Sequence, residues 1–109
     1  MAASTITQVF GPGASQTATT ITIAKADLPG LTPGANNTPE SLLAGIALKA
    51  QSGLPRSSFD TNTDQSIYIE NGFASFITRG PDNDSYRVDQ LTINLAKPDS
   101  GATLDPDDY

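Results

Sequence analysis

The chain has 109 residues and a formal net charge of −6 at pH 7, and it contains neither cysteine nor histidine. This composition excludes disulfides, thiolate metal sites and the side chain that most often serves as a general base. No basic stripe is available to bind a phosphate backbone, and no apolar run reaches membrane-spanning length. We therefore expect neither a nucleic-acid nor a membrane partner.

The apolar content of the chain is small. Leu, Ile, Val and Phe make up about a fifth of the residues, close to the limit below which chains stay disordered. We expect one small β-rich domain over residues 1–97, stabilised by contacts with other chains. Residues 98–109 contain four Asp and no Lys or Arg, which predicts an acidic, extended C-terminal arm.

Two segments near the N-terminus have the composition of strands. Residues 5–10 and 17–25 are rich in Thr, Ile and Val, with rough alternation. The sequence Gly11-Pro12-Gly13 between them predicts a turn. The Thr-rich face of the second segment is typical of an edge strand, which could pair with another chain.

One helix is predicted over residues 38–51. Thr38 is suited to the N-cap, because its hydroxyl can accept a hydrogen bond from the first turn. Pro39 fits the first helical position, where no backbone N–H is needed. Gly53 is expected to end the helix in a left-handed conformation.

The predicted helix has one apolar stripe that should cover a sheet. The stripe consists of Leu42, Leu43, Ile46, Ala47 and Ala50. The opposite side carries Ala44, Gly45 and Leu48, for which two interpretations remain open. Either Leu48 packs on Leu54 and Gly45 has no special role, or these three residues let another chain approach closely.

A β-hairpin is predicted at Asn71-Gly72, the preferred pair for a type I′ turn, joining residues 66–70 to residues 73–77. One face is expected to lie under the helix; it carries Ile67, Ile69, Ala74 and Phe76. The other should meet the N-terminal hairpin or a neighbouring subunit; it carries Tyr68, Glu70, Phe73, Ser75 and Ile77. Tyr68, Phe73 and Ile77 are therefore candidate interface residues.

After a turn at residues 80–84, residues 86–97 are predicted to form the third strand of an antiparallel meander, with Leu91, Ile93 and Leu95 pointing inward. The predicted fold class is mainly β within α+β. It consists of two β-hairpins or an antiparallel meander, a single helix on one sheet face, and extended termini.

Three oxygen-bearing side chains at alternate positions, Asp60, Asn62 and Asp64, match the start of a calcium-binding loop. However, Gln65 stands where that loop needs glycine, and Asn71 stands where it needs a bidentate acid. We therefore predict a solvated loop, with no metal and no cofactor.

Catalytic residues are also hard to assemble from this sequence. A nucleophilic Ser needs a base, His is absent, and Lys25, Lys49 and Lys97 are dispersed along the chain. The acidic pairs lie in hydrophilic turns, where nothing separates their pKa values. We predict that the chain is not an enzyme.

One stretch resembles a segment of small virion structural proteins of tailed phages that infect cyanobacteria. The residues that carry the resemblance are Asp27–Pro33, Asn36–Thr38 and Glu40–Leu43. The resemblance implies a location in the virion, as a capsid decoration protein or a tail-neck accessory protein. Together with the small core, it predicts a homo-oligomer that contacts other virion proteins.

An alternative function is a binding module. It would use calcium held by Asp60, Asn62 and Asp64, or would bind a cell-surface glycan through an exposed Tyr68.

Overall fold

The computed structural model describes residues 3–98, 101 and 103–109, and it confirms the expected α+β class with antiparallel strands. In chain order the helices, 3₁₀ helices and strands are α1 (Ile6–Phe10), β1 (Ser15–Gln16), β2 (Ile21–Thr22), η1 (Lys25–Asp27), α2 (Pro39–Gly53), α3 (Arg56–Thr61), β3 (Ile67–Asn71), β4 (Ser75–Arg79), β5 (Asp84–Val88), β6 (Leu91–Leu95) and η2 (Pro106–Asp108). The single long helix is α2, and two short helices accompany it.

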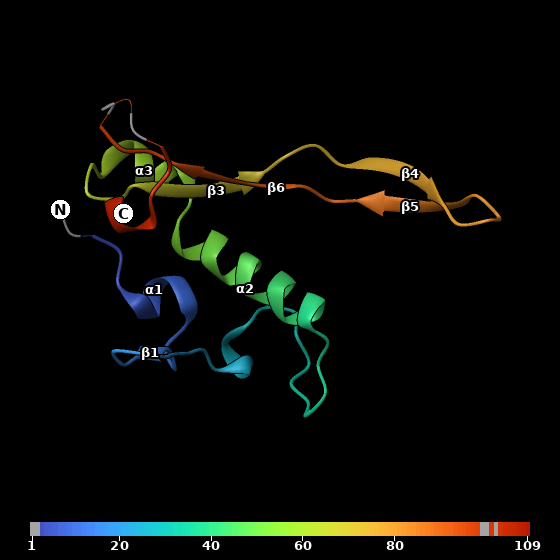
Figure 1. Cartoon of the computed structure of the whole chain (residues 1–109), viewed down its shortest axis with the longest axis horizontal. Helices are drawn as coiled ribbons and strands as arrows, with labels where there is room; N and C mark the ends of the chain where they lie inside the picture. The colour runs from blue at the N-terminus through green and yellow to red at the C-terminus, as the bar shows by residue number, and fades with distance from the viewer. Residues whose placement is uncertain (1–2, 99–100, 102) are drawn as a thin grey trace.

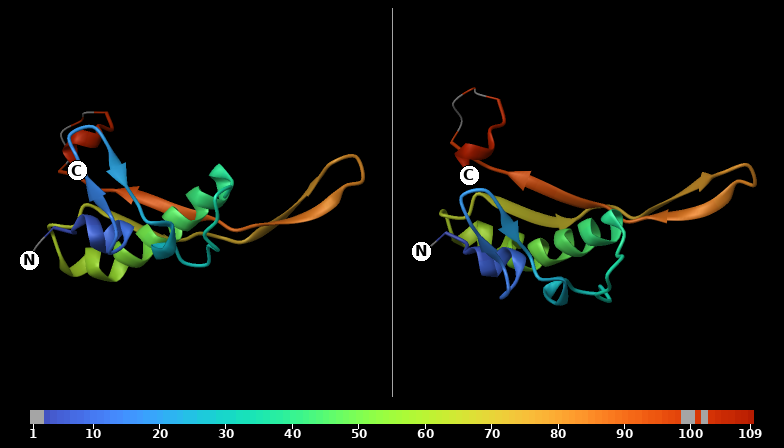
Figure 2. Two further views of the ribbon diagram at one scale, coloured as in Figure 1. Left: turned by 90° about the horizontal axis from the view of Figure 1, so that it is seen from below. Right: turned by 60° about the horizontal axis from the view of Figure 1, so that its bottom comes forward.

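The molecule is elongated. Its radius of gyration is 16.6 Å, whereas a compact chain of this length has a radius of about 13 Å. Its dimensions are 51 × 35 × 25 Å. Most of the added length is the β4–β5 hairpin, which projects from one end while α1 and the C-terminal turn lie at the other (Figures 1 and 2).

The start of α2 follows the sequence prediction. Thr38 is the N-cap, and its hydroxyl accepts a hydrogen bond from the N–H of Ser41 at 3.1 Å. The prediction for the end was wrong, because Gly53 is the last helical residue and Leu54 is the C-cap. Gly53 instead permits close packing, since a Cβ there would overlap the carbonyl oxygen of Gln8.

The predicted N-terminal strand over residues 5–10 was wrong, because this segment forms the helix α1. The Thr5 hydroxyl accepts from the N–H of Gln8, and the Gln8 side chain accepts from the N–H of Thr5, which makes a complete capping box. Lys49 of α2 donates to the Gln8 carbonyl at 3.2 Å. The helix α1 therefore packs beside α2 rather than joining a sheet.

The second predicted strand, residues 17–25, is also much shorter than expected. Only Ile21 and Thr22 are in a strand, opposite Gln16 and Ser15 respectively. The β1–β2 hairpin lies on the side of α2 where α1 is found (Figure 1).

The predicted hairpin at Asn71-Gly72 was wrong. β3 pairs with β6, with Ile69 opposite Ile93. β4 pairs with β5, with Ile77 opposite Tyr86. The chain thus runs outward through β3 and β4 and returns through β5 and β6. The predicted third strand over residues 86–97 is divided between β5 and β6.

The chain reverses at residues 80–83. Gly80 and Asn83 have positive φ angles of 83° and 53°, and the N–H of Asn83 donates to the Gly80 carbonyl at 3.1 Å. Glycine and asparagine tolerate this left-handed backbone better than other residues do. The predicted turn at residues 80–84 therefore forms, whereas the predicted turn at Asn71-Gly72 does not.

A small core lies where α2 crosses β3. Its buried members are Ala50, Leu54 and Ile69, with Val9, Ile67 and Leu91 packed against them. Ile67 and Ile69 thus lie under the helix as predicted. Phe76 does not, because its strand has left the helix and its side chain is 70% exposed.

Of the other residues that were predicted to be buried, some pack against the core and others are exposed. Leu91 packs against the core, but Ile93 and Leu95 are 58% and 41% exposed. On α2, Leu43 is 66% exposed although Ala50 is buried. The apolar stripe is therefore only partly covered.

Gln65 lies between α3 and β3, and among the described residues it is the one polar side chain that is buried. It accepts from the Ser58 hydroxyl at 2.6 Å and donates to the carbonyls of Ile67 at 2.8 Å and Pro55 at 3.2 Å. With its amide fully bonded, the cost of burying this side chain is offset.

The described part of the C-terminal segment turns back onto the chain, so the prediction of an extended arm does not hold for it. Lys97 donates to the Thr103 carbonyl at 3.0 Å and forms an ion pair with Asp108 at 2.7 Å. Tyr109 is half-buried. Asp99 of the predicted arm lies outside the described residues.

Candidate functional site

Among the described residues, the two most exposed large apolar side chains, Phe73 and Phe76, lie within residues 73–90, which we call the ribbon. It contains β4, the turn at residues 80–83, β5 and the two short segments that connect the hairpin to β3 and β6. Every residue of β4 and β5 is exposed. Figure 2 shows that no other element of the described part of the chain covers the hairpin.

The register of β4 and β5 defines two faces of the ribbon. Directly opposed residues share a face. On face A, Ser75 lies opposite Val88, Ile77 opposite Tyr86, and Arg79 opposite Asp84.

Face B carries Phe76 opposite Arg87 and Thr78 opposite Ser85. Each face therefore combines apolar side chains with polar or charged ones, and neither face lies against a core.

The apolar side chains of the ribbon are unusually open to solvent. Phe73 is 90% exposed and Phe76 is 70% exposed, and Ile77, Tyr86 and Val88 are also exposed. Ile77, Tyr86 and Val88 share face A. Isolated exposed apolar residues are common, but several on one face are typical of a binding surface. A two-stranded hairpin is also only marginally stable by itself.

The ribbon is joined to the core at Gly72 and Gln90. The N–H of Gly72 donates to the Gln90 carbonyl at 2.7 Å, and the N–H of Phe73 donates to the Gln90 side-chain oxygen at 3.2 Å. A Cβ on Gly72 would overlap the Gln90 side chain. The outgoing and returning segments of the chain therefore remain in contact between the β3–β6 pair and the β4–β5 pair.

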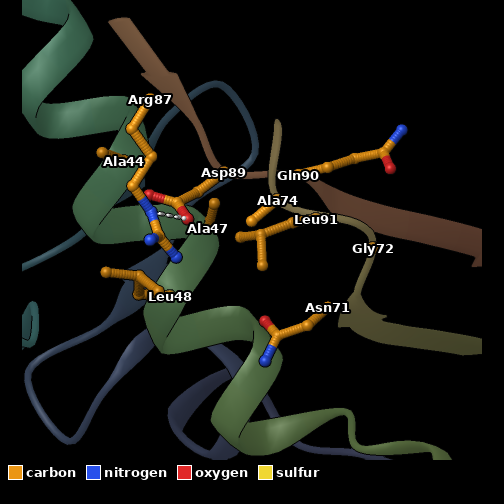
Figure 3. Close-up of a pocket in the computed structure, with 10 residues that line it drawn as sticks. All are labelled: Ala44, Ala47, Leu48, Asn71, Gly72, Ala74, Arg87, Asp89, Gln90 and Leu91. Carbon is orange, nitrogen blue, oxygen red and sulfur yellow. Dashed lines mark hydrogen bonds and ion pairs between the residues drawn. The ribbon is translucent and has the colours of Figure 1, made fainter. Parts of the chain in front are cut away.

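A shallow cleft of about 590 Å³ lies between this junction and α2. Ala44, Ala47 and Leu48 line it from the helix, and Arg87 and Asp89 line it from the ribbon (Figure 3). Arg87 and Asp89 form an ion pair at 2.9 Å. Because both side chains are mostly exposed, solvent screens this pair and it adds little stability.

The total exposed area is large for a chain of this mass. The surface measures 7924 Å², whereas a compact monomer of this size exposes roughly 5,700 Å². The difference, about 2,200 Å², is within the range that one subunit buries in an obligate homodimer.

The structure separates the predicted interface residues on α2. Ala44 and Leu48 are exposed and line the cleft. Gly45 is buried, and a Cβ there would lie 3.1 Å from the Cβ of Leu28. Leu28 of the same chain therefore occupies the space that we had considered for another chain.

The predicted interface residues on the strands also have different environments. Tyr68 is half-buried, with its ring 4.6 Å from Phe59 and 4.8 Å from the Arg56 guanidinium. Phe73 and Ile77 lie on the ribbon and are exposed. The structure therefore leaves these two open to solvent and gives Tyr68 partners within the chain.

Three ribbon residues, Phe76, Tyr86 and Val88, were not among the predicted interface residues. Phe76 was assigned to the core because of the incorrect hairpin. Tyr86 and Val88 alternate with charged residues in the sequence Asp84–Asp89, a pattern that indicates a strand with one apolar face.

The proposed calcium ligands lie around the end of α3. Asp60 forms an ion pair with Arg56 at 3.2 Å, and the Asn62 side-chain oxygen accepts from the N–H of Asp64 at 3.0 Å. Among the described residues, no three acidic side chains converge on a point where they could hold a metal ion. These contacts give no support to a calcium-assisted binding module.

Arg56 is the group with a clearly shifted pKa. The hydrogen bond to Asp60 raises the pKa of Arg56 above its usual value, and the nearby Tyr68 and Glu70 act in the same direction. A group whose pKa is raised on folding stabilises the folded state at any pH below its pKa in the unfolded chain. This stabilisation is lost only as the pH rises through the pKa of the folded state. Because an arginine side chain stays protonated far above neutral pH, the shift makes stability no more dependent on pH near neutrality.

Comparison with known protein families, curated protein sequences and solved structures finds no match to this chain. Within the described part of the chain, no helix combines the length and the apolar character needed to cross a bilayer.

Proposed function

We propose that this chain is a non-enzymatic structural protein that acts by assembly, through contacts with its own copies and with neighbouring proteins of a phage particle. The observation that carries the proposal is the ribbon, a long hairpin with Phe73, Phe76 and Ile77 open to solvent. A small core and an excess of exposed area support the same interpretation, because both are remedied by burial against other chains.

The location in a virion comes from the resemblance of Asp27–Pro33 and the segments that follow it to small virion proteins of tailed phages. In the structure, this stretch is the loop before α2 and the first turns of that helix, and Leu28 anchors it against Gly45. A capsid decoration or tail-neck accessory role suits a small protein with a projecting hairpin, because such a hairpin can contact a neighbouring subunit.

The first test is the oligomeric state of the full chain. Sedimentation velocity across a micromolar concentration series should show a stable oligomer. A monomer at every concentration would overturn the homo-oligomer part of the proposal. The second test is mass spectrometry of purified particles of the phage that encodes the chain. We expect stoichiometric amounts of the protein, and its absence from washed particles would overturn the virion assignment.

A further inference from the structure

The strand β4 has an open edge. β4 and β5 form a sheet of two strands, so among the described residues β4 is paired on one side only. An unpaired edge carries a row of N–H and C=O groups that can pair with another strand. The strand β5 has such an edge as well, and the two edges differ in composition.

The edge of β4 has less of the usual protection against pairing than that of β5. Residues Phe73–Arg79 contain no proline, are rich in aromatic and β-branched residues and carry one charge, that of Arg79 at the end of the strand. By contrast, β5 and the residue after it include Asp84, Arg87 and Asp89. Proteins commonly prevent association at an edge with charged side chains. The β4 edge is therefore the one that is available for pairing.

We infer that β4 pairs antiparallel with β4 of a second copy across a two-fold axis, so that two ribbons form one four-stranded sheet. This inference rests on the proposed function and specifies one of its contacts. A five-residue strand overlaps completely with its own copy only when its middle residue, Ile77, lies on the axis. Ser75 of each copy is then opposite Arg79 of the other.

This register is self-complementary on both faces. Within each chain, Ile77 lies opposite Tyr86 on face A. In the paired sheet, Ile77 of one copy therefore meets Ile77 of the other, and one Tyr86 lies on each side of this pair. On face B, Phe76 lies opposite Thr78 of the other copy. Arg79 faces Ser75, so no like charges are opposed.

The distribution of charge favours a second copy as the partner. The ribbon contains two Arg and three Asp, so its net charge is only −1 although the whole chain carries −6. The acidic C-terminal turn, with Asp105, Asp107 and Asp108, lies at the opposite end of the molecule (Figure 1). Pairing through the ribbons keeps these acidic ends far apart and limits their repulsion.

A two-fold interface needs one patch that is complementary to itself, and the β4 register supplies it.

Because the chain has no cysteine, single-cysteine variants test this register without background. Ile77→Cys places two sulfurs on the axis, and oxidation of the full-length oligomer should yield a disulfide-linked dimer on a denaturing gel. Ser75→Cys alone should link at least about tenfold more slowly, because its two copies would lie about 14 Å apart. A mixture of Ser75→Cys with Arg79→Cys should restore linkage. Thr22→Cys, exposed on β2, measures linkage by random collision.

The outcomes separate the inference from the proposed function. Each variant is first checked for its oligomeric state by sedimentation. An oligomer in which neither Ile77→Cys nor the mixed pair links above the Thr22→Cys level overturns β4 pairing and leaves assembly intact. Equal linkage by Ser75→Cys and Ile77→Cys overturns the register. A chain that stays monomeric, and links nowhere, overturns both.

Discussion

The core around α2 and the ribbon are built from similar sequences but have different environments. Ile69 of β3 and Ile77 of β4 both lie in alternating, β-branched segments, yet Ile69 is 5% exposed and Ile77 is 45% exposed. The difference arises because α2 covers β3, whereas no described element covers β4 (Figure 1). Strand-forming sequence alone therefore does not distinguish a strand that stabilises the monomer from one that is available to a partner.

This comparison assigns different roles to the two regions. The core region, with Ala50, Leu54 and Ile69, should determine the stability of the single chain. The ribbon should determine its association. Mutations in the two regions can test that division, because stability of a monomer does not depend on protein concentration but stability gained by association does.

The largest effect is expected from Leu54→Ala. Leu54 is 8% exposed in the core cluster, and truncation of such a side chain costs about 2–5 kcal/mol. Urea unfolding should show this loss at every protein concentration. Leu43→Ala is the matched control, because it truncates the same type of side chain at a position of α2 that is 66% exposed. Equal losses in both variants would contradict the assignment of the core.

Gly53→Ala should give the next largest effect. The added methyl group would overlap the Gln8 carbonyl, which forces α1 away from α2 at a cost of about 1–3 kcal/mol. Gly34→Ala is the control, since nothing lies within 4 Å of a Cβ there. Thermal unfolding of the two variants measures the difference. A Gly53→Ala variant as stable as wild type would show that α1 is not docked as described.

The helix α2 could be predicted from sequence because its signals are local. Thr38 and Pro39 mark its start through hydrogen bonding and backbone geometry that depend only on neighbouring residues. The helix α1 also has a local signal, the Thr5 and Gln8 capping box. Its content of Thr, Ile and Val favoured a strand, and the capping signal was not given weight.

The strand pairing could not be predicted because two turn sequences compete. Asn71-Gly72 is a good local turn, but Gly80–Asn83 also forms one, and only the second lets β3 pair with β6 beneath α2. That choice depends on contacts between residues distant in sequence. The ribbon, and with it the roles of Phe76 and Tyr86, followed from this choice and was therefore missed.

A smaller effect is expected from Asp108→Asn, which tests whether the C-terminal turn belongs to the core region. The change removes the ion pair with Lys97. Because the Asp108 side chain is 43% exposed, solvent screening limits the loss to about 0.5–1 kcal/mol. Hydrogen exchange should show faster opening of residues 103–109. Asp107→Asn, which removes an equal charge, should change little, and added salt should reduce the difference between the two variants.

The smallest effect on the single chain is expected from Phe76→Ser. Phe76 lies on face B of the ribbon and is 70% exposed, so its loss should change the unfolding free energy of the dilute monomer by no more than about 0.5 kcal/mol. At higher concentration the same change should weaken association, because Phe76 is opposite Thr78 of the second copy.

Thr22→Ser serves as the control for Phe76→Ser, because Thr22 is exposed on β2. Sedimentation and denaturant unfolding over one concentration series measure association and stability on the same samples. A loss of monomer stability as large as that of Leu54→Ala would mean that the ribbon contributes to the core. A stability difference that appears only as concentration rises would assign Phe76 to the interface between chains.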